Sequence, residues 1–440
     1  MDASPVLLLI NPWIYDFAAY DFFARPLGLL YLASWLRRQG YAVHLLDCLD
    51  TPHARNAAWG TGRYPKEILP TPEALKDLPR RYGRYGIREA DFKARLAAIP
   101  PPDAILVTSL MTYWYPGVQA AIRLAREHFP ATPVLLGGIY ASLSPEHAKA
   151  YSGADLIITG PGEEAILPQL AAAGLPTPNP QPQSDLDSKP YPALELLSHL
   201  PYLPLLTSRG CPLDCAYCAS RLLQPRFQRR QPLAVVEEIL YWEGRLGLLD
   251  VAFYDDALLQ EAERHLLVIL EELARRGLSF RFHTPNGLHT RLITPEVARW
   301  LKRSQFLTLR LGVETTALGP ERLDHKLQAG ELETALVNLK EAGFPRQQIG
   351  VYLLIGLPFQ EEAEVIASIR RVQELGATPV LALYSPIPGT ALWPRALATS
   401  RYDLGSDPLF HNNSLFPCWP EFSWERYTRL KRLAAGQELW

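Results

Sequence analysis

The sequence predicts an α/β protein built from two parallel-sheet domains and a small C-terminal extension. Two observations carry this prediction. Short apolar runs alternate with segments of helical periodicity along most of the chain, which is typical of parallel sheets with crossover helices. A stretch with six prolines, Leu175–Pro192, interrupts the alternation and predicts a linker over residues 176–200. The predicted parts are therefore residues 1–175, 201–393 and 394–440.

The first part has the alternating pattern of an open parallel α/β sheet. Gly40 follows a run of apolar residues with helical spacing and suits the left-handed end of a helix. Each apolar run that is bounded by turn residues predicts a strand. Strands are predicted at 6–10, 41–46, 104–110, 134–136 and 155–158, with helices at 29–36, 116–128 and 163–173.

An insertion of about residues 51–103 separates the second and third of these strands. Its segments Trp59–Tyr64 and Arg80–Gly86 contain four arginines and three tyrosines. Guanidinium groups and aromatic rings are suited to gripping an anionic or aromatic substrate. We expect a solvated loop and not a substrate-binding segment, since the role of a long insertion can rarely be inferred from sequence.

The second part repeats the order strand then helix six times, which predicts a barrel or an open sheet of parallel strands. In such folds the loops after the strands face the functional site. The C-terminal part carries one further helix, predicted at Trp424–Leu433, and is expected to close the open side of the barrel. The six strands are predicted at 205–208, 251–254, 280–284, 307–313, 349–355 and 380–384.

Three cysteines, Cys211, Cys215 and Cys218, follow the first strand of the second part with the spacing C-x3-C-x2-C. Cysteine thiolates are the usual protein ligands of iron–sulfur clusters, and three of them can hold one face of a 4Fe-4S cluster. One iron would then stay open to a small molecule, in the way that a catalytic zinc keeps an exchangeable position. The alternatives are a zinc site or a disulfide, although zinc sites normally add a second pair of Cys or His ligands.

This spacing, with Tyr217 just before the third cysteine, resembles the signature of the radical SAM enzymes. The resemblance implies a partial (β/α)6 barrel over residues 201–393 and binding of S-adenosylmethionine at the open iron. It also implies that strand-end residues contact that cofactor, with Glu314 as the main contact outside the cysteine loop. Asp255 and Asp256 are either contacts of the methionyl ammonium or helix N-caps. The remaining contacts implied are Asn286, Gly356 and Pro386.

His283 and His289 also lie near the end of the third strand, and we expect both to be structural. Four arginines beyond the cysteines are expected to form a basic face for a reductant or substrate. They are Arg221, Arg226, Arg229 and Arg230.

A second resemblance concerns residues 1–175, which look like a Rossmann-like cobalamin-binding domain. It rests on Asn11-Pro12, Pro26–Ala33, Gly137–Ser142 and Gly160–Glu164, in that order. The domain departs from the classical pattern because it has no D-x-H-x-x-G motif to supply a lower axial histidine. The resemblance therefore implies cobalamin without a histidine ligand, and the alternative is a sheet domain that has lost the cofactor. The implied contacts are Gly137, Gly138, Gly160 and Gly162, with Ser109 and Tyr113 from a lower-face loop at 109–115.

Together the two resemblances imply reductive cleavage of S-adenosylmethionine to a 5′-deoxyadenosyl radical and cobalamin-dependent methyl transfer to an unactivated carbon. The alternative is a radical rearrangement, cyclisation or oxidation without a methyl-carrying cobalamin. A noncatalytic cobalamin or cluster sensor is a third reading. The resemblance also implies an electron donor such as flavodoxin or ferredoxin.

Composition limits the partners and the compartment. The chain has 440 residues, 48% of them apolar, and a net charge of −2, which argues against nonspecific binding to nucleic acid or an anionic membrane. A small or buried substrate is favoured. The start of the chain lacks a signal peptide or membrane span, and five cysteines without a disulfide pattern fit a reducing compartment, so we expect a cytoplasmic protein. Cys418 is expected to be a packed apolar residue.

Overall fold

The computed structural model describes residues 4–178, 185–319, 322–419 and 421–437. The chain divides into two compact units. Unit 1 comprises the residues up to Pro201 together with Gly405–His411, and unit 2 comprises Tyr202–Leu404 and the residues from Asn412 onward. The described part of the predicted linker belongs to unit 1, where the Tyr41 hydroxyl donates to the Pro176 carbonyl at 2.8 Å. No helix within these described ranges is both long and apolar enough to span a bilayer.

Unit 1 contains a five-stranded sheet in the order β11-β10-β9-β1-β4, and every neighbouring pair is parallel. Leu7, Leu8, Leu9 and Ile10 are fully buried, because helices cover both faces of such a sheet. The strands are β1 (Val6–Asn11), β4 (Ala42–Asp47), β9 (Ala104–Val107), β10 (Val134–Leu136) and β11 (Leu156–Ile157). The helices are α1 (Leu27–Arg38), α2 (Glu89–Ala97), α3 (Tyr115–His128), α4 (Ile139–Leu143), α5 (Pro145–Tyr151) and α6 (Gly162–Ala172).

The strand order reverses between β1 and β9, because the chain passes from β1 to β4 on one side and then returns to β9 on the other. Ligands of doubly wound sheets bind outside the carboxyl ends of the strands at such a point. Asn11 and Asp47 end β1 and β4, and the Asn11 amide donates to Asp47 Oδ1 at 2.7 Å. The sheet of unit 1 therefore offers the site geometry that the sequence predicts.

The prediction of a solvated loop for residues 51–103 is wrong. The exposed fractions of Tyr64, Tyr82 and Tyr85 are 1%, 2% and 0%, and buried Arg84 forms ion pairs with Glu67 and Glu89. The insertion packs because its short strands pair antiparallel with the segment that follows β1, a pattern too brief for sequence periodicity to reveal. One sheet is β2 (Ile14–Asp16), β8 (Gly83–Tyr85) and β7 (Lys66–Ile68), and the other is β3 (Tyr20–Asp21), β6 (Gly62–Arg63) and β5 (Arg55–Asn56).

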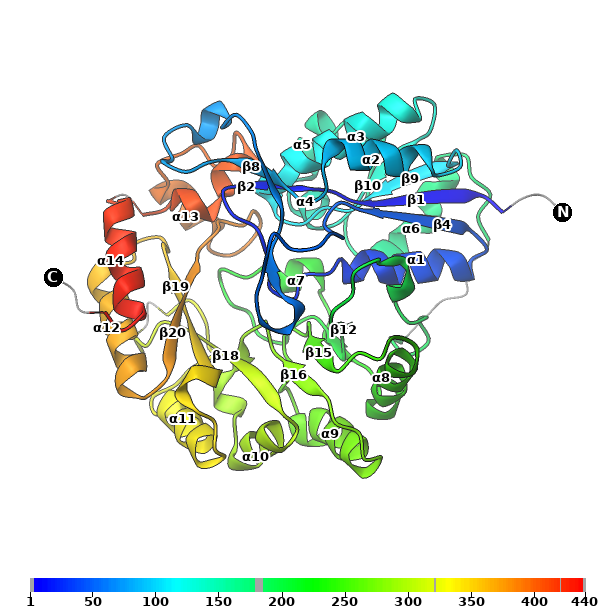
Figure 1. Cartoon of the computed structure of the whole chain (residues 1–440). Helices are drawn as coiled ribbons and strands as arrows, with labels where there is room; N and C mark the ends of the chain where they lie inside the picture. Colours follow the sequence, from blue (N-terminus) through cyan, green and yellow to red (C-terminus); the bar gives the residue numbers. More distant parts are fainter. Residues whose placement is uncertain (1–3, 179–184, 320–321, 420, 438–440) are drawn as a thin grey trace. The chain divides into compact units, whose positions relative to one another are not determined.

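Unit 2 is a parallel sheet whose six main strands follow the chain in the order β12-β15-β16-β18-β19-β20, with β17 (Leu288–His289) paired to β18. Figure 1 shows the helices α8 to α12 along the outer side of these strands. The two end strands are not paired with each other, so the barrel is partial. The strands are β12 (Leu203–Leu205), β15 (Asp250–Phe253), β16 (Arg281–His283), β18 (Phe306–Glu314), β19 (Ile349–Ile355) and β20 (Thr378–Leu383).

The outer helices bury their apolar stripe against the sheet, as Val235, Ile239 and Trp242 do from α8. The C-terminal helix α14 packs beside α12 and β20, where Arg429 of α14 pairs with Glu362 at 2.7 Å. The helices of unit 2 are α7 (Ser220–Leu223), α8 (Pro232–Leu246), α9 (Leu266–Arg275), α10 (Pro295–Arg303), α11 (Glu331–Glu341), α12 (Glu362–Glu374), α13 (Trp393–Thr399) and α14 (Trp424–Ala434).

Candidate functional site

The three cysteines lie on a loop enclosed by a small antiparallel pair, β13 (Ser208–Arg209) and β14 (Gln228–Arg229). The predicted strand 205–208 was therefore misplaced, since β12 ends at Leu205 and the chain then turns into β13. Gly210 has a φ of +79°, and a Cβ there would lie 2.7 Å from the Arg226 carbonyl oxygen. Only glycine fits at this turn into the cysteine loop.

Backbone hydrogen bonds fix the middle of the cysteine loop from two sides. The Ala216 amide donates to the Leu323 carbonyl at 2.9 Å, and the Leu392 amide donates to the Ala216 carbonyl at 2.8 Å. The first partner follows β18 and the second follows β20. The Tyr217 hydroxyl adds a bond of 2.9 Å to Asp324 Oδ2. The loop is thus held by the segments that follow two strands of the sheet.

All three thiols are unpaired with one another, and their exposure differs: Cys211 is half-buried, Cys215 is buried and Cys218 is exposed. Burial raises the pKa of Cys215 to about 11, while the nearby Lys326 ammonium acts in the opposite direction. Within the described ranges, no three Cys, His, Asp or Glu side chains are placed to hold a single metal ion. A cubane cluster does not require the three thiolates to converge on one ion, since each thiolate binds a different iron. The donor set, three thiols on a braced loop beside a cation, fits such a cluster.

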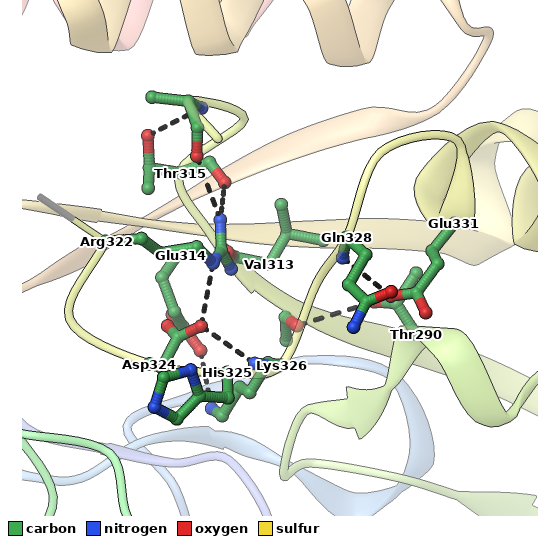
Figure 2. A network of polar contacts seen from close by, with 12 residues as sticks. Thr290, Val313, Glu314, Thr315, Arg322, Asp324, His325, Lys326, Gln328 and Glu331 are labelled. Atoms are coloured by element: carbon green, nitrogen blue, oxygen red, sulfur yellow. Dashed lines mark hydrogen bonds and ion pairs between the residues drawn. The ribbon is translucent and has the colours of Figure 1, made fainter. Parts of the chain in front are cut away.

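Glu314 ends β18 and lies at the centre of the polar network in Figure 2. Its φ is +65°, and the pairing register of β18 with β19 shifts between Gly312 and Glu314. Such a bulge turns a side chain away from its regular direction, and bulges are common beside active sites. Lys326 donates to Glu314 Oε1 at 2.8 Å, and the two side chains are only 15% and 12% exposed.

Lys326 was missed by sequence reasoning, although it joins the cysteine loop to Glu314. Its ammonium lies 5.5 Å from the centre of the Tyr217 ring, a cation–π geometry. Burial lowers its pKa, but Glu314 and Cys215 outweigh that effect, so the pKa is raised above its ordinary value. Lys326 is therefore a fixed positive charge beside the cysteine loop.

Asp324 was also missed, and it braces the same segment. It accepts from Tyr217 and from Arg322 Nε at 2.8 Å, while Arg322 also donates to the Val313 and Thr315 carbonyls (Figure 2). The only sequence signal was a cluster of charged residues between β18 and α11, which resembles an ordinary solvated loop.

The two adjacent aspartates after β15 have different environments. Asp255 is 3% exposed, and it accepts hydrogen bonds from Thr207 and Ser208, including one of 2.6 Å from Ser208 Oγ. Asp256 is exposed and accepts one bond of 2.8 Å from Ser220 Oγ. Asn286 donates to the Tyr254 and Asp255 carbonyls and so holds the same loop. Asp255 is therefore a brace between strand ends, and Asp256 is the accessible carboxylate.

The N-cap alternative for these aspartates is wrong, because the next α-helix, α9, begins only at Leu266.

Gly356 follows β19 with a φ of +88°, and a Cβ there would lie 3.0 Å from the Phe416 ring. Pro386 is buried after β20, six residues before the Leu392 amide that bonds to the cysteine loop.

The histidines and arginines of unit 2 divide between structural and accessible positions. His283 is fully buried and contacts Asp250 at 3.0 Å and Thr308 at 3.2 Å, which supports a structural role. Arg230 is buried in an ion pair with Glu238, so it does not belong to the predicted basic face. Arg221 is 52% exposed beside Asp214. Buried Arg230 shows that arginine clusters in sequence need not share a surface.

In unit 1, the predicted cofactor loops lie at the carboxyl ends of β9, β10 and β11. The Ser109 hydroxyl donates to the Gly137 carbonyl at 2.6 Å and accepts from the Ala141 amide. Gly138 has a φ of +93°, and a Cβ there would lie 2.3 Å from the Ser109 carbonyl oxygen. Ser109 and Tyr113 are 1% and 3% exposed, so both side chains hold the loop 109–115 in place from within.

Gly160 and Gly162 leave space at the same sheet edge. Gly160 has a φ of +76° with no heavy atom within 4 Å of a virtual Cβ, and the nearest one to Gly162 is 3.8 Å away, on Leu32. An open backbone at the carboxyl ends of parallel strands fits the extended tail of a nucleotide-bearing cofactor. The glycine-lined edge therefore fits the nucleotide tail of cobalamin.

Models of two known families match this chain. The model of the radical SAM superfamily matches residues 205–372, and the model of the B12 binding domain matches residues 85–167. The first match contains the three cysteines and Glu314, and the second contains the loop 109–115 and the four glycines.

Three curated relatives have similar sequences. An uncharacterized methyltransferase of Pyrococcus horikoshii is 23% identical over 68% of this chain and 70% of its own length. The hopanoid C-3 methylase of Methylococcus capsulatus is 24% identical over 86% of this chain and 70% of its own. The anaerobic magnesium-protoporphyrin IX monomethyl ester cyclase of Rubrivivax gelatinosus is 24% identical over 61% and 51%.

Among solved structures, the radical S-adenosylmethionine methyltransferase TsrM of Kitasatospora setae, with cobalamin and a 4Fe-4S cluster bound, has the same fold. Its TM-score is 0.64 at 17% identity, over 94% of this chain and 82% of TsrM. The order of the two family matches along the chain agrees with the two sheets described above. The chain is a radical SAM enzyme of the class that carries a B12-binding domain.

Proposed function

We propose that this enzyme is a cobalamin-dependent methyltransferase that transfers a methyl group to an unactivated carbon of a small-molecule substrate. The observation that carries the proposal is the presence of both sites in one chain. A braced three-cysteine loop stands beside the Glu314–Lys326 pair in unit 2, and a glycine-lined sheet edge lies in the B12-binding domain of unit 1. Relatives that carry the word methyltransferase or methylase in their names support this choice.

In unit 2, Cys211, Cys215 and Cys218 would hold the cluster, and Glu314 would bind S-adenosylmethionine. Lys326 keeps the Glu314 carboxylate in place by its bond to Oε1, and Oε2 is left to meet a donor on the cofactor. The exposed Asp256 carboxylate is suited to the methionyl ammonium, a charge-assisted contact. When bound, the cluster supplies the electron that cleaves S-adenosylmethionine to a 5′-deoxyadenosyl radical, and cobalamin supplies the methyl carrier.

In unit 1, the glycines at 137, 138, 160 and 162 would hold the nucleotide tail of cobalamin, and the loop 109–115 would contribute to the lower part of the same site. This loop contains no histidine. His411 contacts it through a bond of 2.9 Å between its Nδ1 and Thr112 Oγ1. The loop would therefore offer bound cobalamin no histidine of its own, and any imidazole ligand would have to come from a neighbouring segment such as the one that carries His411.

Spectroscopy of the protein purified with excess hydroxocobalamin tests the unit 1 part of this proposal. Base-off absorption without nitrogen hyperfine coupling is expected. Nitrogen coupling that disappears in His411→Ala would instead assign a lower ligand to His411. Failure to retain any corrinoid, with the cluster intact, would contradict the methyltransferase proposal and favour rearrangement, cyclisation or oxidation.

A second experiment tests methyl transfer without knowledge of the substrate. The reduced enzyme, loaded with cluster and cobalamin, is incubated with S-adenosylmethionine that carries a deuterated methyl group. Mass spectrometry should find the label in the corrinoid fraction. 5′-Deoxyadenosine release without label in the corrinoid would support the non-methylating alternative.

The reductant is proposed to be flavodoxin or ferredoxin, and the exposed Arg221 lies on the surface that would contact it.

A further inference from the structure

His289 differs from the other buried histidine of the same region, because its side chain faces the cysteine loop. It is 5% exposed, and its Nε2 lies 4.0 Å from Cys211 Sγ. His283, six residues earlier in the sequence, bonds instead to Asp250 and Thr308 inside the sheet. Both histidines were predicted to be structural from the sequence, but their contacts in the structure differ.

Two glycines bring His289 to this position. Gly287 precedes β17, and a Cβ on it would lie 3.0 Å from the Gly312 Cα of β18. His289 pairs in register with Gly312, so no side chain of β18 stands at that position of the ladder. A larger residue at Gly287 would push β17 away from β18 and move the imidazole away from Cys211.

Among the contacts of the described residues, Cys211 Sγ is the hydrogen-bond partner within reach of His289 Nε2. Lys326 and Arg291 are the charged groups that act on its ring, and both are cations that accept no hydrogen bond. A thiolate that ligates iron has no proton, so a hydrogen bond between the pair must run from Nε2–H to sulfur. The bond does not depend on titration, because an imidazole with a proton on Nε2 donates in either charge state.

We propose that His289 donates a hydrogen bond from Nε2 to the Sγ of cluster-bound Cys211 and thereby sets the reduction potential of the cluster. This inference rests on the cluster assigned to the cysteine loop and does not depend on the identity of the substrate. Hydrogen bonds to ligand sulfur are one of the means by which proteins tune cluster potentials. The bond stabilises the reduced, more negative cluster, so it raises the potential. His289 is a positioning and tuning residue that does not itself touch substrate.

The test uses the full-length protein, reconstituted anaerobically, and measures the cluster midpoint potential by redox titration followed by electron paramagnetic resonance. His289→Phe keeps a ring of similar size and removes the donor, and His289→Gln keeps a donor. His325→Phe is the matched control, since His325 is an exposed histidine on the neighbouring segment. Iron and sulfide content are measured for every variant.

The phenylalanine variant at position 289 should keep its iron and shift to a lower potential by about 59 mV, which is a tenfold change in a one-electron equilibrium. The glutamine variant should recover most of the shift, and the control should match wild type. An unchanged potential in His289→Phe with full iron would overturn the proposal. Equal loss of iron in both His289 variants would do the same, because it would assign His289 a packing role. Wild type without a cluster would refute the cluster assignment itself, which is a distinguishable result.

Discussion

Replacing Glu314 with alanine removes the carboxylate that we expect to bind S-adenosylmethionine. Glu314 is 12% exposed, and Lys326 holds its Oε1 at 2.8 Å, so the carboxylate reaches the cofactor already oriented. A hydrogen bond to a charged group contributes about 1.5 to 3 kcal/mol. Since about 1.4 kcal/mol corresponds to a tenfold change in affinity, the dissociation constant should rise by about ten- to 150-fold.

A double-mutant cycle with Glu314→Gln and Lys326→Met tests whether Lys326 acts through Glu314. Each single change leaves its partner largely buried without an opposite charge, which is destabilising, whereas the double variant removes both charges. The effects on stability should therefore be strongly non-additive, as for other groups in direct contact. Glu331→Gln serves as the control, because Glu331 is a half-buried carboxylate at the start of α11 that bonds to the Gln328 amide and not to Lys326.

Isothermal titration of the reconstituted variants with S-adenosylmethionine measures the affinities, thermal unfolding measures the stabilities for the cycle, and iron content is checked for each variant. Wild-type affinity in Glu314→Ala, with a full cluster, would refute the assignment of Glu314. Additive effects in the cycle would refute the claim that Lys326 acts through Glu314.

Two further predictions concern buried groups away from the cysteine loop. Cys418 is fully buried with its Sγ 3.8 Å from the Ala396 carbonyl, so Cys418→Ser should keep wild-type iron content, and loss of iron would show that it is a ligand. Burial raises the pKa of Asp47 from 3.8 to about 6, so the folded protein binds this proton more tightly than the unfolded chain. Protonated Asp47 contributes fully to the free energy of unfolding below pH 4. This contribution falls by about 2 to 3 kcal/mol as the pH rises through 6. Thermal unfolding between pH 4 and 7 should show this loss in wild type and not in Asp47→Asn; parallel curves would contradict it.

The long parallel strands could be predicted from sequence because each is a run of mainly apolar residues. Strand β19 was predicted with its observed bounds, Ile349–Ile355, and the other main strands of unit 2 were placed within three residues. The first of them was the least accurate, since Thr207 looks like strand sequence but serves as a partner of Asp255. Local sequence pattern does not contain that contact.

The residues around the cysteine loop were harder to find, because their contacts join distant segments. The bond between Tyr217 and Asp324 spans 107 positions, and nothing in the sequence near Lys326 indicates its pairing with Glu314. The buried tyrosines of the insertion were missed for a related reason. Their strands have two or three residues each, which is too short for alternation to be recognised.

The iron content and cleavage activity of Cys215→Ala test the central claim most directly. Cys215 is the most buried of the three thiols and lies next to Ala216, whose backbone the segments after β18 and β20 hold. Wild type and Cys418→Ser, reconstituted anaerobically and reduced, should each bind one 4Fe-4S cluster and release 5′-deoxyadenosine from S-adenosylmethionine. Cys215→Ala should lose both properties. A full cluster with undiminished 5′-deoxyadenosine release in Cys215→Ala would contradict the account.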